Sequence, residues 1–273
     1  MAVINRTPDS FYDHGATFAF DRAVDAALDA ARLGADWVDI GGVPFGRGVH
    51  VSVAEEIDRI APVVEAIAGA SDVVISVDTN RAAVARAAID AGAAVINDTS
   101  GLGDPGMAEV IAASDAQIVI THSVGPPRAE KPAAHFDDVV AEVRRFLQER
   151  VALAEDAGVP RTRIIIDPGH DLDKNTRHSL ELTRRFDEIA TLGLPVLAAV
   201  SNKDFIGESI DREQGQRLVG SIAAMVLCIE RGARIVRMHD VEPAIDAVRM
   251  VESILGMRQP ARLEHNMHPT RNV

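Results

Sequence analysis

The sequence predicts a single (β/α)8 barrel, in which eight parallel strands close into a ring covered by helices. The first observation is a run of three isoleucines that ends at Asp167, after which Pro168 and Gly169 stop the extended chain. Short runs that are apolar on both faces are typical of parallel strands buried under helices. The second observation is a repeated helix, glycine and strand order, as in AARLGADWVDI and IERGARIVR. Eight such units close into a barrel.

Each strand is expected where a short apolar run ends at a polar residue, a glycine or a turn. The expected strands are 2–5, 37–40, 73–78, 93–97, 117–121, 164–167, 196–200 and 234–237. A segment with helical spacing follows each strand, which predicts helices at 21–33, 53–68, from about 80 to 90, 105–113, 136–157, 176–191, 213–231 and 244–255.

Two of these helices carry clear end signals. Gly34 stands just beyond the first helix, where a left-handed residue commonly ends one. Thr79 or Asn80 is placed to cap the helix that runs to Asp90. No linker or break in composition interrupts the pattern, so we expect one barrel domain over 1–257 and a surface tail over 258–273.

Composition excludes several classes of protein. The 273 residues are 47% hydrophobic and 25% charged, which supplies a large core, and the net charge of −13 argues against a general nucleic-acid binder. The single cysteine, Cys228, lies in an apolar run, which predicts a core residue and excludes a disulfide framework. No segment reads as a membrane span or a signal peptide, so we expect no membrane partner and a cytoplasmic protein. Met1 falls almost on the first strand, from which we expect a natural start upstream.

Polar residues close several of the buried strands. Asp78, Asn97, Asp167 and His239 each stand at or just past a strand end, and Gly41-Gly42 follow another. Any one of them alone is as well explained by a helix cap or a turn. Together they predict a site at the carboxyl ends of the strands, where parallel barrels carry their chemistry.

The types of residue at this rim indicate two kinds of ligand group. Arg237 and His239 are two apart and project to the same side of an extended strand, which suits an anion. The acceptors and amide of Asp78, Asn97 and Asp167 suit a flat heterocycle with an amino-pyrimidine edge. Lys203, just past the seventh strand, could form a Schiff base, bind a phosphate or donate a hydrogen bond.

The sequence offers too few oxygen ligands for a metal site made by the protein alone. Asn5 or Asp9 could hold a divalent cation through oxygen, but a substrate phosphate would have to complete the shell. The four histidines at 122, 135, 170 and 178 lack ligand spacing, and we interpret most of them as surface or loop residues. The phosphate-loop, nucleophile-elbow and zinc-helix motifs are absent, and GGVPFGRG lacks the spacing of a dinucleotide fingerprint.

Several motifs in combination resemble the dihydropteroate synthase family from Val3 to about Ile254. They are INRTPDSF, GADWVDIGG, ISVDT, AAVINDTSG, IIIDPG, PVLAAVSNKDFIG and RIVRMHDV. The resemblance implies a barrel that joins p-aminobenzoate to 6-hydroxymethyl-7,8-dihydropterin diphosphate and releases pyrophosphate. It also implies a homodimer that pairs through late helices.

The resemblance further implies roles for individual residues. The pterin would lie on Asp78, Asn97, Asp167 and Lys203, and the diphosphate on Arg237 and His239, with Asn5 on Mg2+. Diphosphate would leave before the amine attacks, and a carboxylate, Asp9 or Asp13, would stand near the cation-like methylene. Lys203 would act as a hydrogen-bond donor.

The chain departs from the family pattern where p-aminobenzoate would be received. Phe45 and Gly46 replace a threonine and an arginine, with Arg47 displaced by one, while Asn202 and Asp204 replace an arginine and a serine. The variants resemble a divergent second actinobacterial paralogue of the synthase. Three functions therefore stay open: a working synthase, a pterin-binding paralogue with little or no synthase activity, and a folate-dependent methyltransferase-type barrel.

Overall fold

Eight parallel strands form the centre of the molecule. The computed structural model describes residues 1–5, 19–43, 51–124 and 135–265. The strands pair in sequence order along one sheet: β1 (Ala2–Asn5), β2 (Trp37–Gly41), β3 (Val74–Asp78), β4 (Val95–Asp98), β5 (Gln117–Thr121), β6 (Ile164–Asp167), β7 (Val196–Ala198) and β8 (Ala233–Val236). A parallel bridge between Ala2 and Met238 joins the two edges, so the sheet closes as predicted.

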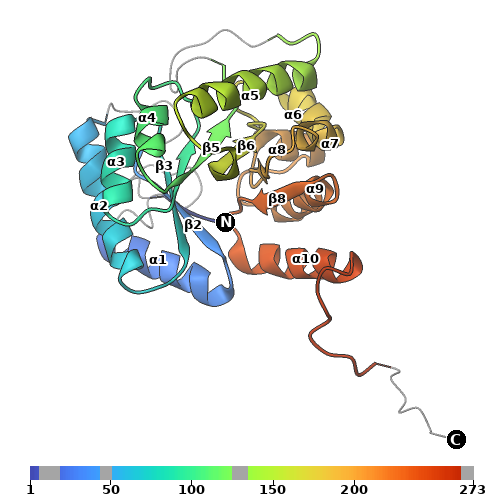
Figure 1. Cartoon of the computed structure of the whole chain (residues 1–273). Helices are drawn as coiled ribbons and strands as arrows, with labels where there is room; N and C mark the ends of the chain where they lie inside the picture. The colour runs from blue at the N-terminus through green and yellow to red at the C-terminus, as the bar shows by residue number, and fades with distance from the viewer. Residues whose placement is uncertain (6–18, 44–50, 125–134, 266–273) are drawn as a thin grey trace, which may run out of the picture.

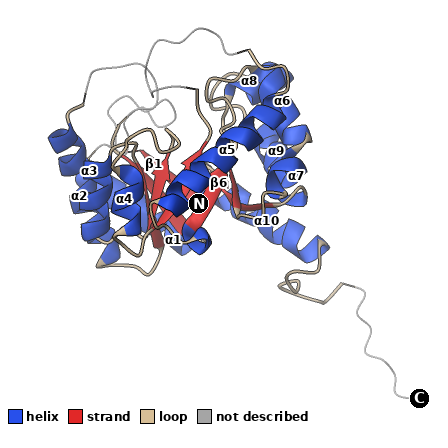
Figure 2. Ribbon diagram, turned by 45° about the horizontal axis from the view of Figure 1, so that its top comes forward, coloured by secondary structure: helices blue, strands red, loops and turns tan. Residues whose placement is uncertain are grey.

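Helices surround the strands on the outside (Figures 1 and 2). In the described residues they are α1 (Phe20–Leu33), α2 (Val53–Ala68), α3 (Ala82–Asp90), α4 (Met107–Ala112), α5 (Val139–Asp156), α6 (Thr176–Arg184), α7 (Phe186–Ala190), α8 (Asp204–Ile210), α9 (Leu218–Glu230) and α10 (Val241–Ile254), with a 3-10 turn, η1 (Arg161–Arg163). Their apolar faces and the outer faces of the strands form the larger core.

A second, smaller core fills the barrel interior. Val95, Val119, Ile165 and Leu197 come from four neighbouring strands, and five further apolar residues pack against them: Met1, Trp37, Val74, Ala199 and Ile235. Because side chains alternate along a strand, the residues two positions further on face the same interior, nearer the carboxyl rim. The apolar cluster is therefore the floor below the polar strand ends.

Most element boundaries agree with the sequence prediction, but two helical regions do not. The predicted helix at 176–191 is two helices, α6 and α7, because Arg185 leaves the helical region with φ −113° and ψ 30°. No helix was predicted between β7 and residue 213, but α8 lies there, and the following helix begins at Leu218 instead of residue 213. The start of α6 is well defined, since Asn175 and His178 form a capping box.

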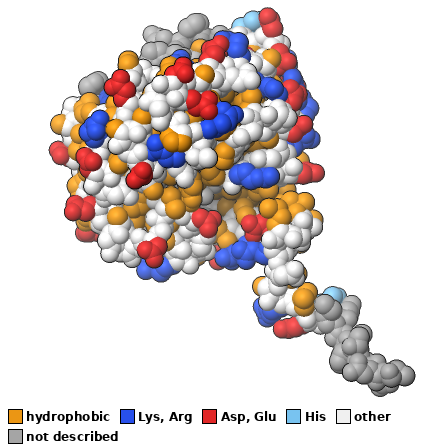
Figure 3. All heavy atoms as spheres, viewed as in Figure 1, with side chains coloured by type: hydrophobic (Ala, Val, Ile, Leu, Met, Phe, Trp, Pro, Cys, Tyr) orange, Lys and Arg blue, Asp and Glu red, His pale blue; other side chains and the backbone are white. Residues whose placement is uncertain are grey.

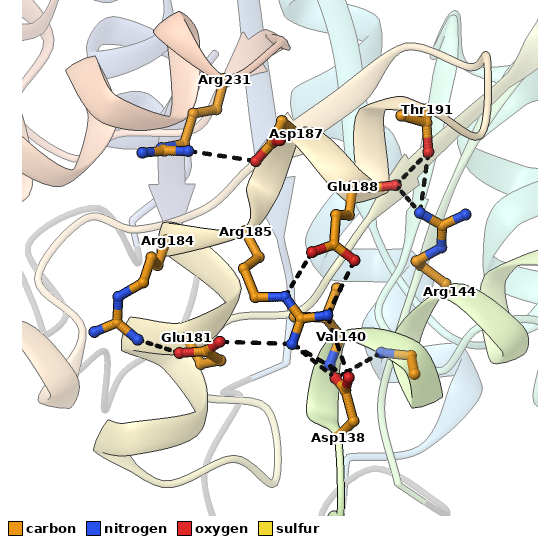
Figure 4. A network of polar contacts seen from close by, with 11 residues as sticks. Asp138, Val140, Arg144, Glu181, Arg184, Arg185, Asp187, Glu188, Thr191 and Arg231 are labelled. Atoms are coloured by element: carbon orange, nitrogen blue, oxygen red, sulfur yellow. Dashed lines mark hydrogen bonds and ion pairs between the residues drawn. The ribbon is translucent and has the colours of Figure 1, made fainter.

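Ion pairs hold the break at Arg185 in place (Figure 4). Its guanidinium donates to Asp138, which also caps α5, and to Glu188 on α7, with Glu181 on α6 at 3.5 Å. Three helices thus meet at one cation. Glu181 and Glu188 lie four residues before and three residues after Arg185, and these spacings also suit a continuous helix, which explains why the sequence did not predict the break.

The predicted cap of α3 is wrong. The helix is preceded by Arg81, which makes no side-chain cap, and the amide of Ala82 instead donates to Asp104 at 2.8 Å. The hydroxyl of Thr79 donates to the buried carboxylate of Glu56 at 2.7 Å and accepts the N–H of Arg81, the residue before the helix, at 3.3 Å. An acid from the next loop therefore takes the place of a local cap.

Cys228 lies in the core as predicted, and burial raises the pKa of its thiol to about 12. In the part of the chain that the structure describes, no helix is long and apolar enough to cross a membrane.

Candidate active site

Four neighbouring strands end in one row at the rim. Asn5 pairs with Gly41, Gly41 with Asp78, and Asp78 with Asn97. A Cβ atom on Gly41 would lie 3.8 Å from the Asn5 Oδ1 atom and 3.8 Å from the Asp78 Cβ atom, so these two side chains flank the glycine. The structure therefore brings together three of the predicted site residues.

Arg237 reaches this row from the opposite edge of the sheet. It follows β8, and its backbone amide donates to the carbonyl of Ala198 at 3.0 Å. Its Nη2 atom lies 3.4 Å from an Asp78 carboxylate oxygen, and its Nε atom donates to Asp39 at 2.6 Å. Asp39 is fully buried at the middle of β2 and was not predicted as a site residue. A carboxylate inside an otherwise apolar strand was the signal in the sequence.

The carboxyl of Asp78 is unusually hard to ionise. Burial, together with the nearby charge of Asp39, raises its pKa to about 7, and Arg237 opposes that shift. A carboxyl group with a pKa near neutrality can change its protonation state at the pH of the cell, which is common in active sites.

Asp167 closes β6 at the same rim. Its Oδ1 atom accepts the amide N–H of Gly169 at 2.7 Å. Burial raises the pKa of Asp167, and the N–H of Gly169 and the charges of Lys203 and Lys174 oppose the shift. Burial lowers the pKa of Lys203, and the negative charge of Asp171 opposes this shift. Carboxylates and cations thus face one another at this side of the rim.

The segment after β7 is tied to the end of β8. The hydroxyl of Ser201 accepts the backbone N–H of His239 at 3.1 Å and lies 3.0 Å from its Nδ1 atom. Asn202 is buried in a left-handed conformation with φ +56°. Its backbone N–H donates to Ser221 on α9, and its carbonyl accepts from Arg217. These contacts fix the positions of Lys203 and His239 relative to each other.

Asp204 is already paired with a cation. Its carboxylate accepts from Arg217 Nη1 at 2.8 Å, while the Asp204 side chain remains 79% exposed. Gly207 makes room for this arginine, because a Cβ atom there would lie 2.3 Å from the Arg217 Nε atom. The negative charge predicted at Asp204 is therefore present, but the positive charge of Arg217 partly neutralises it.

Two histidines differ from the sequence prediction. His122 and His170 lie in or next to loops but are buried, whereas His135 is exposed and His178 is half-buried. His122 lies against Lys174, a buried lysine in the turn after β6 that the sequence did not single out. His170 lies between the rings of Phe186 and Phe205.

Part of the predicted site lies outside the described residues. These positions are Asp9 and Asp13, predicted to face the methylene, and Phe45, Gly46 and Arg47 of the loop after β2. The site is therefore described without most of the loops that follow β1 and β2.

The residues near Asn5 suit a magnesium ion only if the substrate contributes ligands. Across residues 1–5, 19–43, 51–124 and 135–265, no group of three or more His, Cys, Asp or Glu residues could hold a metal ion. The Oδ1 atom of Asn5 lies beside Gly41 at the strand ends. A single amide oxygen suits Mg2+ when waters and substrate phosphate oxygens complete the shell, as is common for this ion.

The fold and this rim define an enzyme-like parallel barrel in which a guanidinium stands beside a row of hydrogen-bonding groups. The chain matches the family described as pterin binding enzyme over residues 1–239. The chain belongs to the dihydropteroate synthase family.

Individual relatives cover nearly the whole chain. An inactive dihydropteroate synthase 2 of Mycobacterium leprae is 44% identical over 272 residues, 96% of this chain and 92% of the relative. The dihydropteroate synthase of Escherichia coli K12 is 38% identical over 97% of this chain and 94% of its own length. The structure of the Xanthomonas albilineans enzyme with 4-aminobenzoic acid superposes with a TM-score of 0.87 at 41% identity, covering 93% of this chain and 92% of that one.

These relatives confirm the predicted family and fold. They also include the divergent paralogue that the altered motifs resemble, under a name that describes it as inactive. None of the three is a methyltransferase, and the methyltransferase alternative gains no support.

Proposed function

We propose that the protein is a dihydropteroate synthase-type transferase that binds 6-hydroxymethyl-7,8-dihydropterin diphosphate. The observation that carries the proposal is the position of Arg237, whose guanidinium reaches the row of strand ends and approaches Asp78 at 3.4 Å. A cation beside buried acceptors matches a ligand that is a diphosphate at one end and an N–H-rich heterocycle at the other.

The pterin ring would bind along the row of acceptors. When they are ionised, Asp78 and Asp167 only accept hydrogen bonds, and each can then receive N–H groups from the amino-pyrimidine edge. Asn97 offers an amide, and Lys203 a hydrogen-bond donor for a ring nitrogen or carbonyl. Burial of these groups, which is complete or nearly so for Asn97 and Asp167, strengthens such hydrogen bonds.

The leaving group would be held at the Arg237 side. In the reaction, the bond between the pterin methylene and the diphosphate oxygen breaks, and the oxygen keeps the electron pair. Arg237 and His239 would stabilise that charge, and the amine of p-aminobenzoate would then attack the methylene and lose a proton. Mg2+, held through Asn5 and the substrate itself, would supply further neutralisation of the diphosphate.

A second candidate function is pterin binding without condensation. It is favoured by Asn202 and Asp204, which replace an arginine and a serine of the family motif, and by the mycobacterial relative named inactive. Asp204 stands at the start of α8, beside Lys203. An added carboxylate there disfavours a second carboxylate, such as that of p-aminobenzoate.

Calorimetric titration separates the two candidates. Pterin diphosphate with Mg2+ is titrated first, and p-aminobenzoate is then added while pyrophosphate release is measured. Binding followed by release supports the synthase, and binding without release supports the second candidate. The variant Arg237→Gln should abolish binding, whereas Arg231→Gln, which removes a charge that pairs with Asp187, should not. Failure of the wild type to bind at all would refute both.

We also propose that the protein is a homodimer located in the cytoplasm. Apolar side chains are exposed on the last two helices, notably Val219 (81%) on α9 and Met250 (60%) and Ile254 (69%) on α10. Apolar surface is visible in the region of α10 in Figure 3. Light scattering on the wild type should give twice the chain mass, and Val219→Glu with Met250→Glu should give the monomer. A wild-type monomer at micromolar concentration would contradict the proposal.

A further inference from the structure

A polar layer lies inside the barrel, between the apolar floor and the rim. Its centre is Asp39, on the interior-facing side of β2 two residues before Gly41. The residue is fully buried, with an exposure of 0%. Its side chain is therefore one layer below the groups that would meet a ligand.

Three side chains donate hydrogen bonds to this carboxylate. Ser76 Oγ donates to Oδ1 at 2.6 Å, while Asn97 Nδ2 and Arg237 Nε donate to Oδ2 at 3.0 Å and 2.6 Å. The donors come from β3, β4 and the end of β8, so Asp39 connects strands that are far apart in the sequence. Two of the three donors are residues of the proposed site.

The first consequence concerns the amide of Asn97. An ionised carboxylate accepts hydrogen bonds and cannot donate them. Asn97 must therefore turn its NH2 group toward Asp39, and the amide oxygen lies on the other side of the group. An asparagine that was free to flip would offer a ligand either a donor or an acceptor.

The second consequence concerns the guanidinium of Arg237. Because its Nε–H is held by Asp39, the plane of the guanidinium is fixed, and Nη2 is directed at Asp78. Arginine binds anions through the edges of this rigid plane, so fixing the plane fixes the direction from which an anion is bound.

We propose that Asp39 is a positioning residue, which fixes the amide of Asn97 as an acceptor and the guanidinium of Arg237 as an anion clamp. The proposal rests on the proposed function, because it gives Asp39 the task of arranging two groups for a pterin diphosphate. Asp39 would thereby set the ligand specificity of the site, which then favours a ligand with an N–H donor on one side and an anion on the other.

The test compares Asp39→Asn with Ser76→Ala. Asp39→Asn keeps the shape of the side chain but removes its negative charge, so that Arg237 loses its ion pair and only a neutral amide oxygen remains to accept from Arg237 and Asn97. Ser76→Ala removes the third hydrogen bond of Asp39 and leaves both site residues held. Each variant removes buried hydrogen bonding, and both should therefore unfold at a lower temperature than the wild type.

Only Asp39→Asn should change ligand binding. We expect its Kd for pterin diphosphate with Mg2+ to rise about tenfold or more, a typical effect of losing hydrogen bonds to charged groups. The pH at which binding is half-maximal should also fall, because the charge of Asp39 contributes to the raised pKa of Asp78. A folded Asp39→Asn that keeps the wild-type Kd and pH midpoint would show that Asp39 only stabilises the fold.

Nuclear magnetic resonance of the ligand-free protein provides a second readout. In the wild type, the Nδ2 protons of Asn97 and the Nε proton of Arg237 should exchange slowly with solvent. They should do so in Ser76→Ala but exchange faster in Asp39→Asn, where the acceptor carries no charge. Rapid exchange of both groups in the wild type would overturn the proposal even if Asp39→Asn failed to fold. If the wild type binds no pterin diphosphate, the proposed function fails, and this measurement still tests the role of Asp39.

Discussion

The Nζ atom of Lys174 lies 2.8 Å from the Nδ1 atom of His122, and both side chains are buried beside the rim. Burial lowers the pKa of Lys174 to about 7. In its ammonium form the group only donates, so that Nδ1 accepts and the imidazole is neutral with its proton on Nε2. Lys174 also donates to the carbonyls of Gly169 at 2.8 Å and Leu172 at 3.0 Å. The Lys174 ammonium group thus stabilises the turn that follows Asp167.

Removing this cation should loosen the turn that carries Asp167. Lys174→Met keeps an unbranched side chain but leaves the buried acceptors of His122, Gly169 and Leu172 without their donor. We expect the free energy of unfolding to fall by about 2 to 4 kcal/mol, as is typical when buried polar groups lose their partners. Urea denaturation measures this loss.

The control for Lys174→Met is Arg177→Met, which removes an exposed charge from α6 a few residues away. Its denaturation midpoint should stay within the error of the wild-type value. An equal effect of the two variants would mean that the bonds made by Lys174 contribute little.

Buried neutral histidines should make the protein sensitive to acid. Burial lowers the pKa of His170 to about 3 and also lowers the pKa of His122, whereas an unfolded histidine has a pKa near 6.5. Between pH 6.5 and the folded-state values, the unfolded chain binds protons that the folded chain does not. Stability should therefore fall as the pH drops below 6.5, by up to about 1.4 kcal/mol per pH unit for each histidine.

His170→Phe isolates one of these two contributions. The new ring would stand between Phe186 and Phe205, and Thr183 would keep its hydrogen bond to the carbonyl of Ser179. We expect a shallower loss of stability between pH 6 and pH 4 in this variant. The exposed His135→Gln should have the slope of the wild type, and the same slope in all three proteins would refute the assignment.

The fold could be predicted from the sequence because a parallel barrel imposes a local pattern. Strands covered on both sides must be apolar, as the run that ends at Asp167 is, and each must be followed by a helix. The row formed by Asn5, Asp78 and Asn97 then follows from their positions at strand ends. The positions of these residues could be predicted, although their roles as ligand contacts stay a prediction.

The inner contacts could not be predicted in the same way. Strand alternation places Asp39 inside the barrel, but its partner Arg237 is 198 positions away in the sequence. The choice of partner depends on which side chains meet across the interior, and no local pattern records it. His122 and Lys174 are likewise 52 positions apart, so that neither residue type nor spacing indicated their contact.

Binding of pterin diphosphate should weaken as the pH falls through neutrality. The folded-state pKa of Asp78 is about 7, so the free protein carries a proton on this carboxyl at lower pH. A protonated carboxyl loses an acceptor position for the N–H groups of the ligand. The affinity should decrease by up to about tenfold per pH unit below pH 7. Calorimetry from pH 6 to pH 8 measures the effect.

Asp78→Asn tests whether Asp78 causes this dependence. An asparagine does not titrate in this range, so the variant should bind weakly with little change between pH 6 and pH 8. A pH dependence that persists in Asp78→Asn would assign it to another group, such as His239 or the substrate diphosphate.

Removing the carboxylate of Asp204 should improve the binding of p-aminobenzoate. In Asp204→Ser the negative charge at the start of α8 disappears, while Arg217 keeps its hydrogen bond to the carbonyl of Asn202. The arginine is then available to a ligand carboxylate. Because the position is exposed and screened by salt, we expect a gain in affinity of only about two- to tenfold, which should shrink as the salt concentration rises. Adding Gly46→Arg should increase condensation activity further.

The matched control for Asp204→Ser is Asp211→Asn, which removes one charge at the other end of α8. Asparagine tolerates the left-handed conformation of residue 211, so the fold should be kept. Sulfonamides carry the same aromatic amine, and their binding should rise in Asp204→Ser but not in the control. A tight sulfonamide complex of the wild type that competes with p-aminobenzoate would contradict a blocking role for Asp204. Equal gains in the two variants would show that net charge, and not the position of Asp204, governs binding of the second substrate.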